Sequence, residues 1–251
     1  MKKILKAISM LCAALAFLSM SGIVRASLIT IGTATYSGSD YNLIWDDDNN
    51  GKSVIWLDYT SLPKTWNQQI NWASTLNGSG ILSYHINSAY TVDWGVSDWR
   101  LPETVDGVDA LGYQGPDNGM YDYTSGYNLY NSEMGHLYYE ELGNKGYVAT
   151  DGSSPQPGWG LINKGDFQNL DEYWYWSSTE YAASQGANAW GFYMHNGRQN
   201  QGTKDFARAG LALREGRVST VPIPEPPIIL LFFTAIVGLT AHRGKRKGNS
   251  T

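Results

Sequence analysis

Hydrophobic and polar residues alternate most clearly in the last third of the chain, over 173–214. Three apolar runs there, 173–176, 189–194 and 209–213, are separated by stretches rich in Gly, Asn and Gln. Successive strand residues point to opposite faces, so alternate large side chains share one face. In the second run these side chains are Trp190, Phe192 and Met194. The pattern predicts three strands of an antiparallel core sheet, with a turn at Asn196-Gly197.

Two shorter strand-like runs, 41–45 and 53–57, flank a polar segment nearer the start of the chain. Alternate oxygen-bearing side chains followed by glycine match the first half of a calcium-binding loop. The candidate calcium ligands are Asp46, Asp48 and Asn50. The twelfth position of such a loop carries Leu57 in place of the usual bidentate Glu. A polar hairpin turn explains the same residues, so a calcium site and a plain turn both stay open.

Two amphipathic helices are predicted between the strands. The first begins at Thr65, which forms a capping-box pattern with Gln68, and its apolar residues recur at helical spacing up to Leu76. The second covers 132–142, carries one apolar stripe and ends before Gly143. Each apolar face needs a sheet to cover.

The rest of 105–165 is rich in Gly, Tyr, Asn and Asp and predicts long loops. Aromatic loops can form a sugar-binding surface, because Tyr and Trp rings stack on the apolar faces of pyranoses. They can equally pack on themselves as an insertion without a ligand. Both interpretations stay open.

The start of the chain, 1–26, predicts a secretory signal peptide. Three lysines precede the apolar run 8–17, and small or apolar residues precede a cut before Ser27. The apolar run is shorter than the roughly 20 residues that a membrane-spanning helix needs. The chain's single cysteine, Cys12, lies in this segment. The exported domain, 27–220, is therefore expected to be held together by its core, without disulfides.

Charge excludes one class of partner. The full chain has 18 Lys+Arg and 23 Asp+Glu; without the eight basic residues of its two ends and Glu225, 10 remain against 22 in 27–224. Nucleic-acid binding depends on neutralising phosphates with Lys and Arg, so we expect no nucleic-acid partner. The acidic balance suits a soluble extracellular domain, or one that binds neutral sugars or cations.

The C-terminal segment, 221–251, combines three features in order. A proline-rich spacer holds Pro224, Glu225 and Pro226, the apolar stretch 228–241 follows, and a basic cluster closes the chain. A basic cluster directly after an apolar run is typical of a transmembrane helix whose C-terminus stays in the cytoplasm.

This order resembles a PEP-CTERM sorting signal. The resemblance implies a Gram-negative bacterium in which an exosortase of the inner membrane recognises the Pro-Glu-Pro motif and removes the tail. The protein would then pass from the inner membrane to the cell surface or the extracellular polysaccharide matrix. A plain membrane anchor that is never cleaved is the alternative.

The exported domain is similar to the Lcl C-terminal-like domain of bacterial adhesins. The residues that carry the resemblance include Trp99, Arg100, Leu101, Pro102, Tyr173, Trp174, Trp176, Ser177, Ser178, Trp190 and Arg214. It implies an α+β fold of the C-type-lectin-like kind, related in shape to the formylglycine-generating sulfatase-modifying domain. Such a fold has a small antiparallel sheet, two or so helices and long loops. The resemblance assigns no ligand residues, so we expect the four tryptophans in the core and Arg100 in a structural ion pair.

Three functions fit these observations: a non-enzymatic module that binds extracellular polysaccharide, a purely structural surface protein, and a glycan-active enzyme. Sulfatase-modifying relatives use cysteine chemistry, which a mature chain without cysteine cannot perform. No HExxH or GxSxG motif occurs, and His85, His136 and His195 are not spaced as metal ligands. Carboxylates for glycoside hydrolysis would come from Glu133, Glu140, Glu141, Asp166 and Glu172. We expect the first function, without enzymatic activity and with calcium as the one candidate cofactor.

Overall fold

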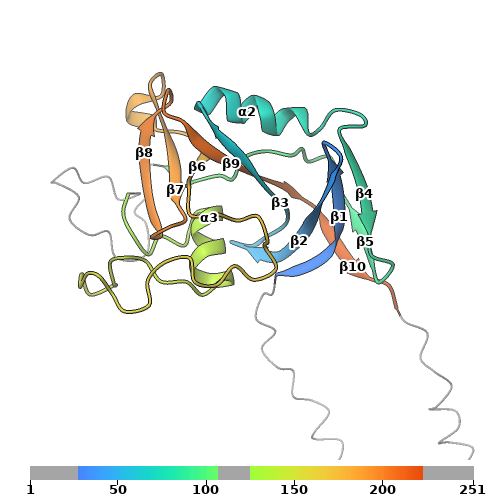
Figure 1. Ribbon diagram of the computed structural model, residues 1–251, viewed down its shortest axis with the longest axis horizontal. Coiled ribbons are helices and arrows are strands. Elements are labelled where there is room, and N and C mark those ends of the chain that lie inside the picture. The colour runs from blue at the N-terminus through green and yellow to red at the C-terminus, as the bar shows by residue number, and fades with distance from the viewer. Residues whose placement is uncertain (1–27, 107–124, 223–251) are drawn as a thin grey trace, which may run out of the picture.

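The computed structural model describes residues 28–106 and 125–222, and within them the main element is an eight-stranded sheet (Figure 1). Its strand order is β4-β1-β2-β3-β9-β6-β7-β8. The strands are β1 (Ile29–Tyr36), β2 (Ser39–Asn49), β3 (Lys52–Lys64), β4 (Leu82–Ile86), β6 (Trp174–Glu180), β7 (Asn188–Tyr193), β8 (Arg198–Thr203) and β9 (Arg208–Glu215). Neighbours are antiparallel except β6 and β9, which run parallel and pair at Tyr175 and Ala209. The α+β class is confirmed, but the sheet is mixed and larger than the small antiparallel sheet predicted.

Smaller elements complete the described part of the chain. A two-stranded ribbon pairs β5 (Tyr90–Asp93) with β10 (Arg217–Thr220). The helical elements are α2 (Trp66–Thr75), α3 (Glu133–His136), the π-helical turn η2 (Leu137–Glu141) and the 3₁₀ turn η3 (Ala182–Ser184). None of these helices is long and apolar enough to cross a membrane. The predicted signal peptide and sorting tail, with the apolar stretch 228–241 and the motif at Pro224, lie outside the described residues.

Apolar side chains along the central strands point alternately to the two faces of the sheet, so the core consists of two hydrophobic clusters, one on each face. On β3, Val54 and Trp56 point to one face of the sheet while Ile55 and Leu57 point to the other. On β9 the predicted inward row of Ala209, Leu211 and Leu213 shares the face of Val54. The sheet is therefore buried on both faces, as the dense apolar runs require.

One face of the sheet is covered by α2, the helix whose start the capping-box pattern predicted (Figure 1). The backbone N–H of Thr65 donates to Gln68 Oε1 at 3.1 Å, and the helix ends at Thr75, before Asn77-Gly78. Trp66 and Trp72 of the helix are buried against the sheet. Burying two indoles supplies several kcal/mol in total, at about 1.5–3 kcal/mol for a large apolar side chain.

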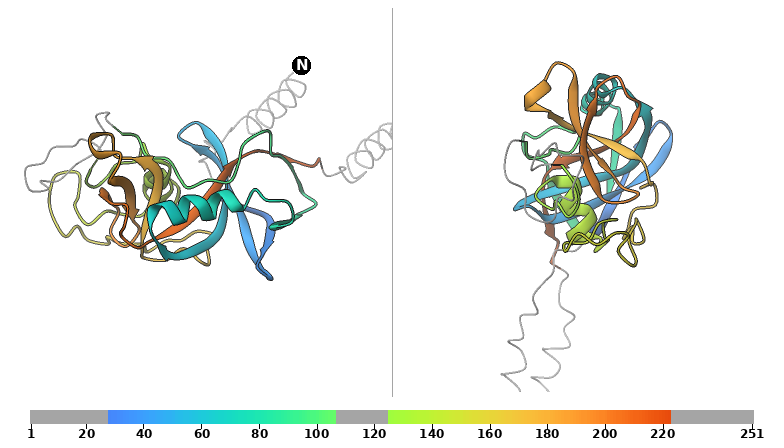
Figure 2. Two further views of the ribbon diagram at one scale, coloured as in Figure 1. Left: turned by 90° about the horizontal axis from the view of Figure 1, so that it is seen from above. Right: turned by 90° about the vertical axis from the view of Figure 1, so that its left-hand side faces the viewer.

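The other face of the sheet is covered by α3, η2 and the long loop that follows them. Both figures show this loop on the same side of the sheet as α3 (Figures 1 and 2). The stripe predicted for this helix is confirmed, since its members Met134, Leu137, Tyr138 and Leu142 are all buried. The helix itself differs from the prediction, because its second turn is a π-turn closed by Leu142 N donating to Leu137 O at 2.9 Å.

Residues 99–104 run between β9 and β6, and this brings two distant motifs together. Arg100 and Leu213 exchange backbone hydrogen bonds, each 3.0 Å long. On the other side, Ser178 N donates to Pro102 O at 2.8 Å. The WRLP segment thus lies next to the strand that carries Trp176-Ser177-Ser178.

Candidate functional site

Five aromatic side chains and one histidine form a continuous row, which we call the aromatic strip. In order along the row, its members are Trp174, Tyr193, His195, Trp159, Tyr147 and Tyr127. Neighbouring ring centroids lie 4.8, 5.3, 5.2, 5.0 and 6.4 Å apart in that order. All six side chains are partly exposed to solvent. The strip is therefore a connected series of rings that each keep part of their surface accessible to solvent.

Two parts of the chain build the aromatic strip. Trp174 and Tyr193 are cross-strand partners on β6 and β7, and their rings stack with only 5° between the planes. The remaining rings come from the turn after β7 and from the long loops. The loop that holds Tyr147 is fixed to the β7–β8 turn, since Tyr147 N donates to Asn196 O at 2.9 Å, and Tyr139 of η2 is fixed to the same turn by Oη donating to Gly197 O at 2.6 Å. The rings are thus held in place before any ligand arrives.

Arg208 supports the strip from inside. Its guanidinium lies 4.6 Å from the ring centroid of Trp174 and 4.2 Å from that of Trp176. Room for it exists only because positions 191 and 202 are glycines, at which a Cβ atom would collide with the guanidinium. Burial lowers the pKa of Arg208 to about 10, and among the described residues its Nη1 has no hydrogen-bond partner. This cation fixes the Trp174 ring, since an arginine stacks on aromatic faces.

A small, mostly apolar pocket of about 200 Å³ lies at the Trp174 end of the strip, with a few polar groups in its wall. Glu172 and the exposed Tyr173 lie beside the stacked pair there. The carboxylate of Glu172 lies 2.8 Å from Nδ1 of His195. Ring faces next to a carboxylate and hydroxyl groups are the surface that a sugar needs, because its C–H face is apolar and its rim carries hydroxyls. The pocket and the stacked rings beside it therefore have the chemistry to bind a sugar.

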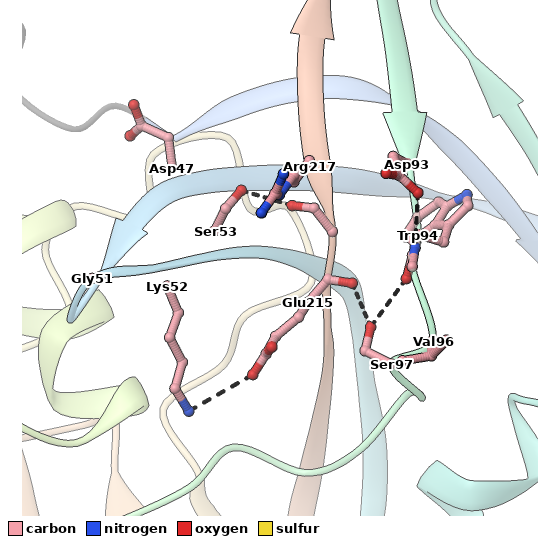
Figure 3. Close-up of a pocket in the computed structure, with 12 residues that line it drawn as sticks. Asp47, Gly51, Lys52, Ser53, Asp93, Trp94, Val96, Ser97, Glu215 and Arg217 are labelled. Atoms are coloured by element: carbon pink, nitrogen blue, oxygen red, sulfur yellow. Dashed lines mark hydrogen bonds and ion pairs between the residues drawn. The ribbon is translucent and has the colours of Figure 1, made fainter.

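A second, wider groove of about 650 Å³ opens beside the β2–β3 turn (Figure 3). Lys52 reaches toward Glu215 across it, with Nζ 3.7 Å from Oε1, and Ser97 Oγ donates to the backbone oxygen of Glu215 at 2.6 Å. The one indole in its wall, Trp94, packs against Tyr84 and under the guanidinium of Arg214. Its side chains thus mostly contact one another, so this groove is the weaker candidate.

The three candidate calcium ligands have separate environments. Asp46 is fully buried and accepts hydrogen bonds from Asn49 and Trp56, at 2.8 and 3.2 Å. Asp48 is exposed and accepts a hydrogen bond from Gly51 N at 3.0 Å. Asn50 adopts a left-handed φ of 54° and donates to Ser132 O at 3.3 Å. These contacts fit the hairpin interpretation, and calcium at the three side chains stays a prediction.

The residues that carry the family resemblance are mostly structural. Trp99, Trp176 and Trp190 are buried as predicted, and each indole N–H donates to a partner: Tyr84 Oη, Lys64 O and Asp106 Oδ1. Leu101, Pro102 and Ser177 are buried as well. The prediction was wrong for Trp174, which is half-exposed because its ring stacks on the surface of the β6–β7 hairpin.

The predicted ion pair of Arg100 is present. Its Nη1 and Nη2 lie 2.7 and 2.8 Å from the two carboxylate oxygens of Glu133, in a bidentate pair. Glu133 is almost fully buried, and the bidentate pair is its closest charge contact, with Lys52 Nζ farther away at 3.6 Å. The pair connects residues 99–104 to α3.

The sequence drew attention to aromatic loops but singled out neither Trp159 nor Tyr193. A family-model scan finds no match to the chain, and neither do searches of curated proteins and of solved structures. The resemblance to sorting signals and adhesin domains therefore remains a prediction from the residues. What the chain does is inferred from its geometry.

Proposed function

We propose that this chain is an exported, non-enzymatic protein of a Gram-negative cell surface or extracellular matrix, and that its aromatic strip binds polysaccharide. The strip is the observation that carries the proposal. It offers consecutive, partly exposed rings in contact with one another, and a glycan chain likewise presents consecutive sugar faces. We infer a lectin-like fold from the resemblance to the Lcl C-terminal-like domain. A sheet with long loops on one side is compatible with such a fold.

Export and sorting by an exosortase rest on the order of signal peptide, Pro-Glu-Pro motif, apolar stretch and basic end. A glycan-active enzyme is the weaker alternative, because it needs two carboxylates facing one sugar site. Of the candidates, Glu133 is bound by Arg100 and the side chain of Glu141 is buried beside His136. A purely structural protein without ligand is the other alternative.

The test is binding of the protein, produced from its full-length chain, to the exopolysaccharide of the producing cell, with calcium and again with a chelator. Trp159→Ala and Tyr193→Ala should each weaken binding at least about 10-fold, as loss of a central aromatic contact does. Phe206→Ala removes an exposed ring outside the strip and is the matched control. Absence of saturable binding in both conditions would favour the structural alternative.

The same preparation tests sorting. If the tail is removed, the intact mass of surface-extracted protein should correspond to a chain that ends near Pro226. A mass that retains Arg243 and the residues after it would refute processing and support a permanent anchor.

A further inference from the structure

Three titratable side chains meet in the interior below the sheet, in what we call the Asp46 cluster: Asp46, His136 and Glu141. One ligand atom from each lies within 4.8 Å of those of the other two. Asp46 is fully buried, and the side chains of Glu141 and His136 are 3% and 14% exposed. They come from β2, α3 and η2, and Figure 1 shows α3 beside the end of β2.

Two oxygen atoms of the Asp46 cluster have no hydrogen-bond donor within residues 28–106 and 125–222. Asp46 Oδ2 accepts from Asn49 and Trp56, and Glu141 Oε1 lies 3.3 Å from His136 Nε2. The second oxygens, Asp46 Oδ1 and Glu141 Oε2, are buried without a partner among the described residues. A buried carboxylate oxygen without a donor is costly, and two of them beside an imidazole call for a cation.

The π-turn η2 is what brings two of the ligands together. His136 and Glu141 are five residues apart, which in an α-helix would place them roughly 140° apart around the axis. The wider π-turn, closed by Leu142 N and Leu137 O, lets both side chains face Asp46. Single π-turns inside helices often occur at functional sites.

We propose that Asp46, His136 and Glu141 bind one divalent transition-metal ion, with Zn²⁺ as the preferred ion. One imidazole nitrogen and two carboxylates are a ligand set that zinc accepts, with open positions for further ligands. Calcium takes six to eight oxygen ligands, and imidazole favours zinc and its neighbours over calcium. The site shares only Asp46 with the calcium loop that the sequence suggested.

The ion would fasten the end of β2 to η2. The neighbouring residue Tyr139 in η2 donates to Gly197 O, below the aromatic strip. Metal binding would therefore brace the loops that carry the strip, because an ion bound only by the folded state adds stability. The site does not depend on the polysaccharide proposal, since none of its ligands belongs to the strip.

The test is Zn²⁺ binding by untagged protein produced from the full-length chain, measured by calorimetry and metal analysis after chelator treatment. The wild type should bind one ion per chain and melt roughly 5–10 °C higher at a Zn²⁺ concentration 100 times Kd. Glu141→Gln and Asp46→Asn should weaken binding more than about 10-fold and reduce the shift to about half or less, since even outer-shell changes cost 10–100-fold.

Two matched variants control for surface binding. Glu140→Gln changes the exposed neighbour of Glu141, and His195→Gln removes the imidazole of the aromatic strip; both should bind zinc as the wild type does. Circular dichroism confirms that each variant is folded, and Asp46→Asn retains an oxygen for the hydrogen bonds of Asn49 and Trp56. Absence of Zn²⁺ and Mn²⁺ binding by the wild type would overturn the proposal. So would zinc binding that survives both Glu141→Gln and Asp46→Asn.

Discussion

The aromatic strip and the Asp46 cluster depart from the usual distribution of side chains in opposite directions. The strip leaves large apolar rings half-exposed, whereas the cluster buries charged groups with two oxygens unpaired among the described residues. Exposed apolar patches and buried polar groups are the informative exceptions in a folded protein. We propose a partner of matching chemistry for each region: a sugar with an apolar face and hydroxyl groups for the strip, and a cation for the cluster.

The pair of Arg100 and Glu133 shows what a buried charge looks like when the chain supplies its own partner. Two short hydrogen bonds satisfy both carboxylate oxygens, and Glu103 N donates a third at 2.6 Å. Two members of the Asp46 cluster, His136 and Glu141, lie on the same helical segment as Glu133, but two carboxylate oxygens of the cluster have no partner among the described residues. The contrast between these two buried carboxylate sites can be tested directly.

The largest loss of stability is expected when the ion pair between Arg100 and Glu133 is removed. Arg100→Met leaves the side chain of Glu133, only 5% exposed, without its bidentate partner and should cost about 3–5 kcal/mol in the free energy of unfolding. Lys52→Met removes a cation that is 41% exposed and should cost less than about 1 kcal/mol. Urea denaturation measures both. Equal losses would mean that Arg100 acts only as a surface charge.

The second effect concerns how the stability of the metal-free protein, kept in a chelator, depends on the protonation of Asp46. Burial raises the pKa of Asp46 from its ordinary 3.8 to about 6. The folded state therefore holds this proton more tightly than the unfolded chain, and the resulting stability is complete below pH 3.8 and lost as the pH rises through 6. Relative to Asp46→Asn, the metal-free wild type should lose about 2–3 kcal/mol between pH 3.5 and pH 7. Unfolding of both proteins across this range measures the difference, and a pH-independent difference would contradict it.

The smallest of the three effects concerns the support of the aromatic strip. In Gly191→Ala the new Cβ would lie 2.6 Å from Tyr175 O and collide with the guanidinium of Arg208, so we expect a loss of about 1–3 kcal/mol. Gly186→Ala is the control, because nothing lies within 4 Å of its added Cβ. Its unfolding free energy should stay within about 0.5 kcal/mol of wild type. Thermal and urea unfolding of the two variants should separate them, and similar stabilities would show that the Arg208 site is not tightly packed.

Periodic segments were predictable from the sequence, and segments without periodicity were not. The alternation in β3 and β9 and the capping box of α2 are local patterns with a single structural outcome. Strand β8 was not predicted, because its residues are Arg, Gln, Asn, Gly and Thr. On the buried face of this strand, Gly202 has no side chain and so leaves space for the guanidinium of Arg208. That space becomes visible only when both strands are in place.

The sequence by itself determined the two helices and the central strands, because these depend on runs of residues that are neighbours in the chain. Only the tertiary structure decided which rings form the aromatic strip and which acids surround His136. Asp46 is 90 positions from His136, and Trp174 reaches Tyr127 only through four intervening rings. Such neighbours are set by strand pairing and loop docking, so no pattern within one segment encodes them.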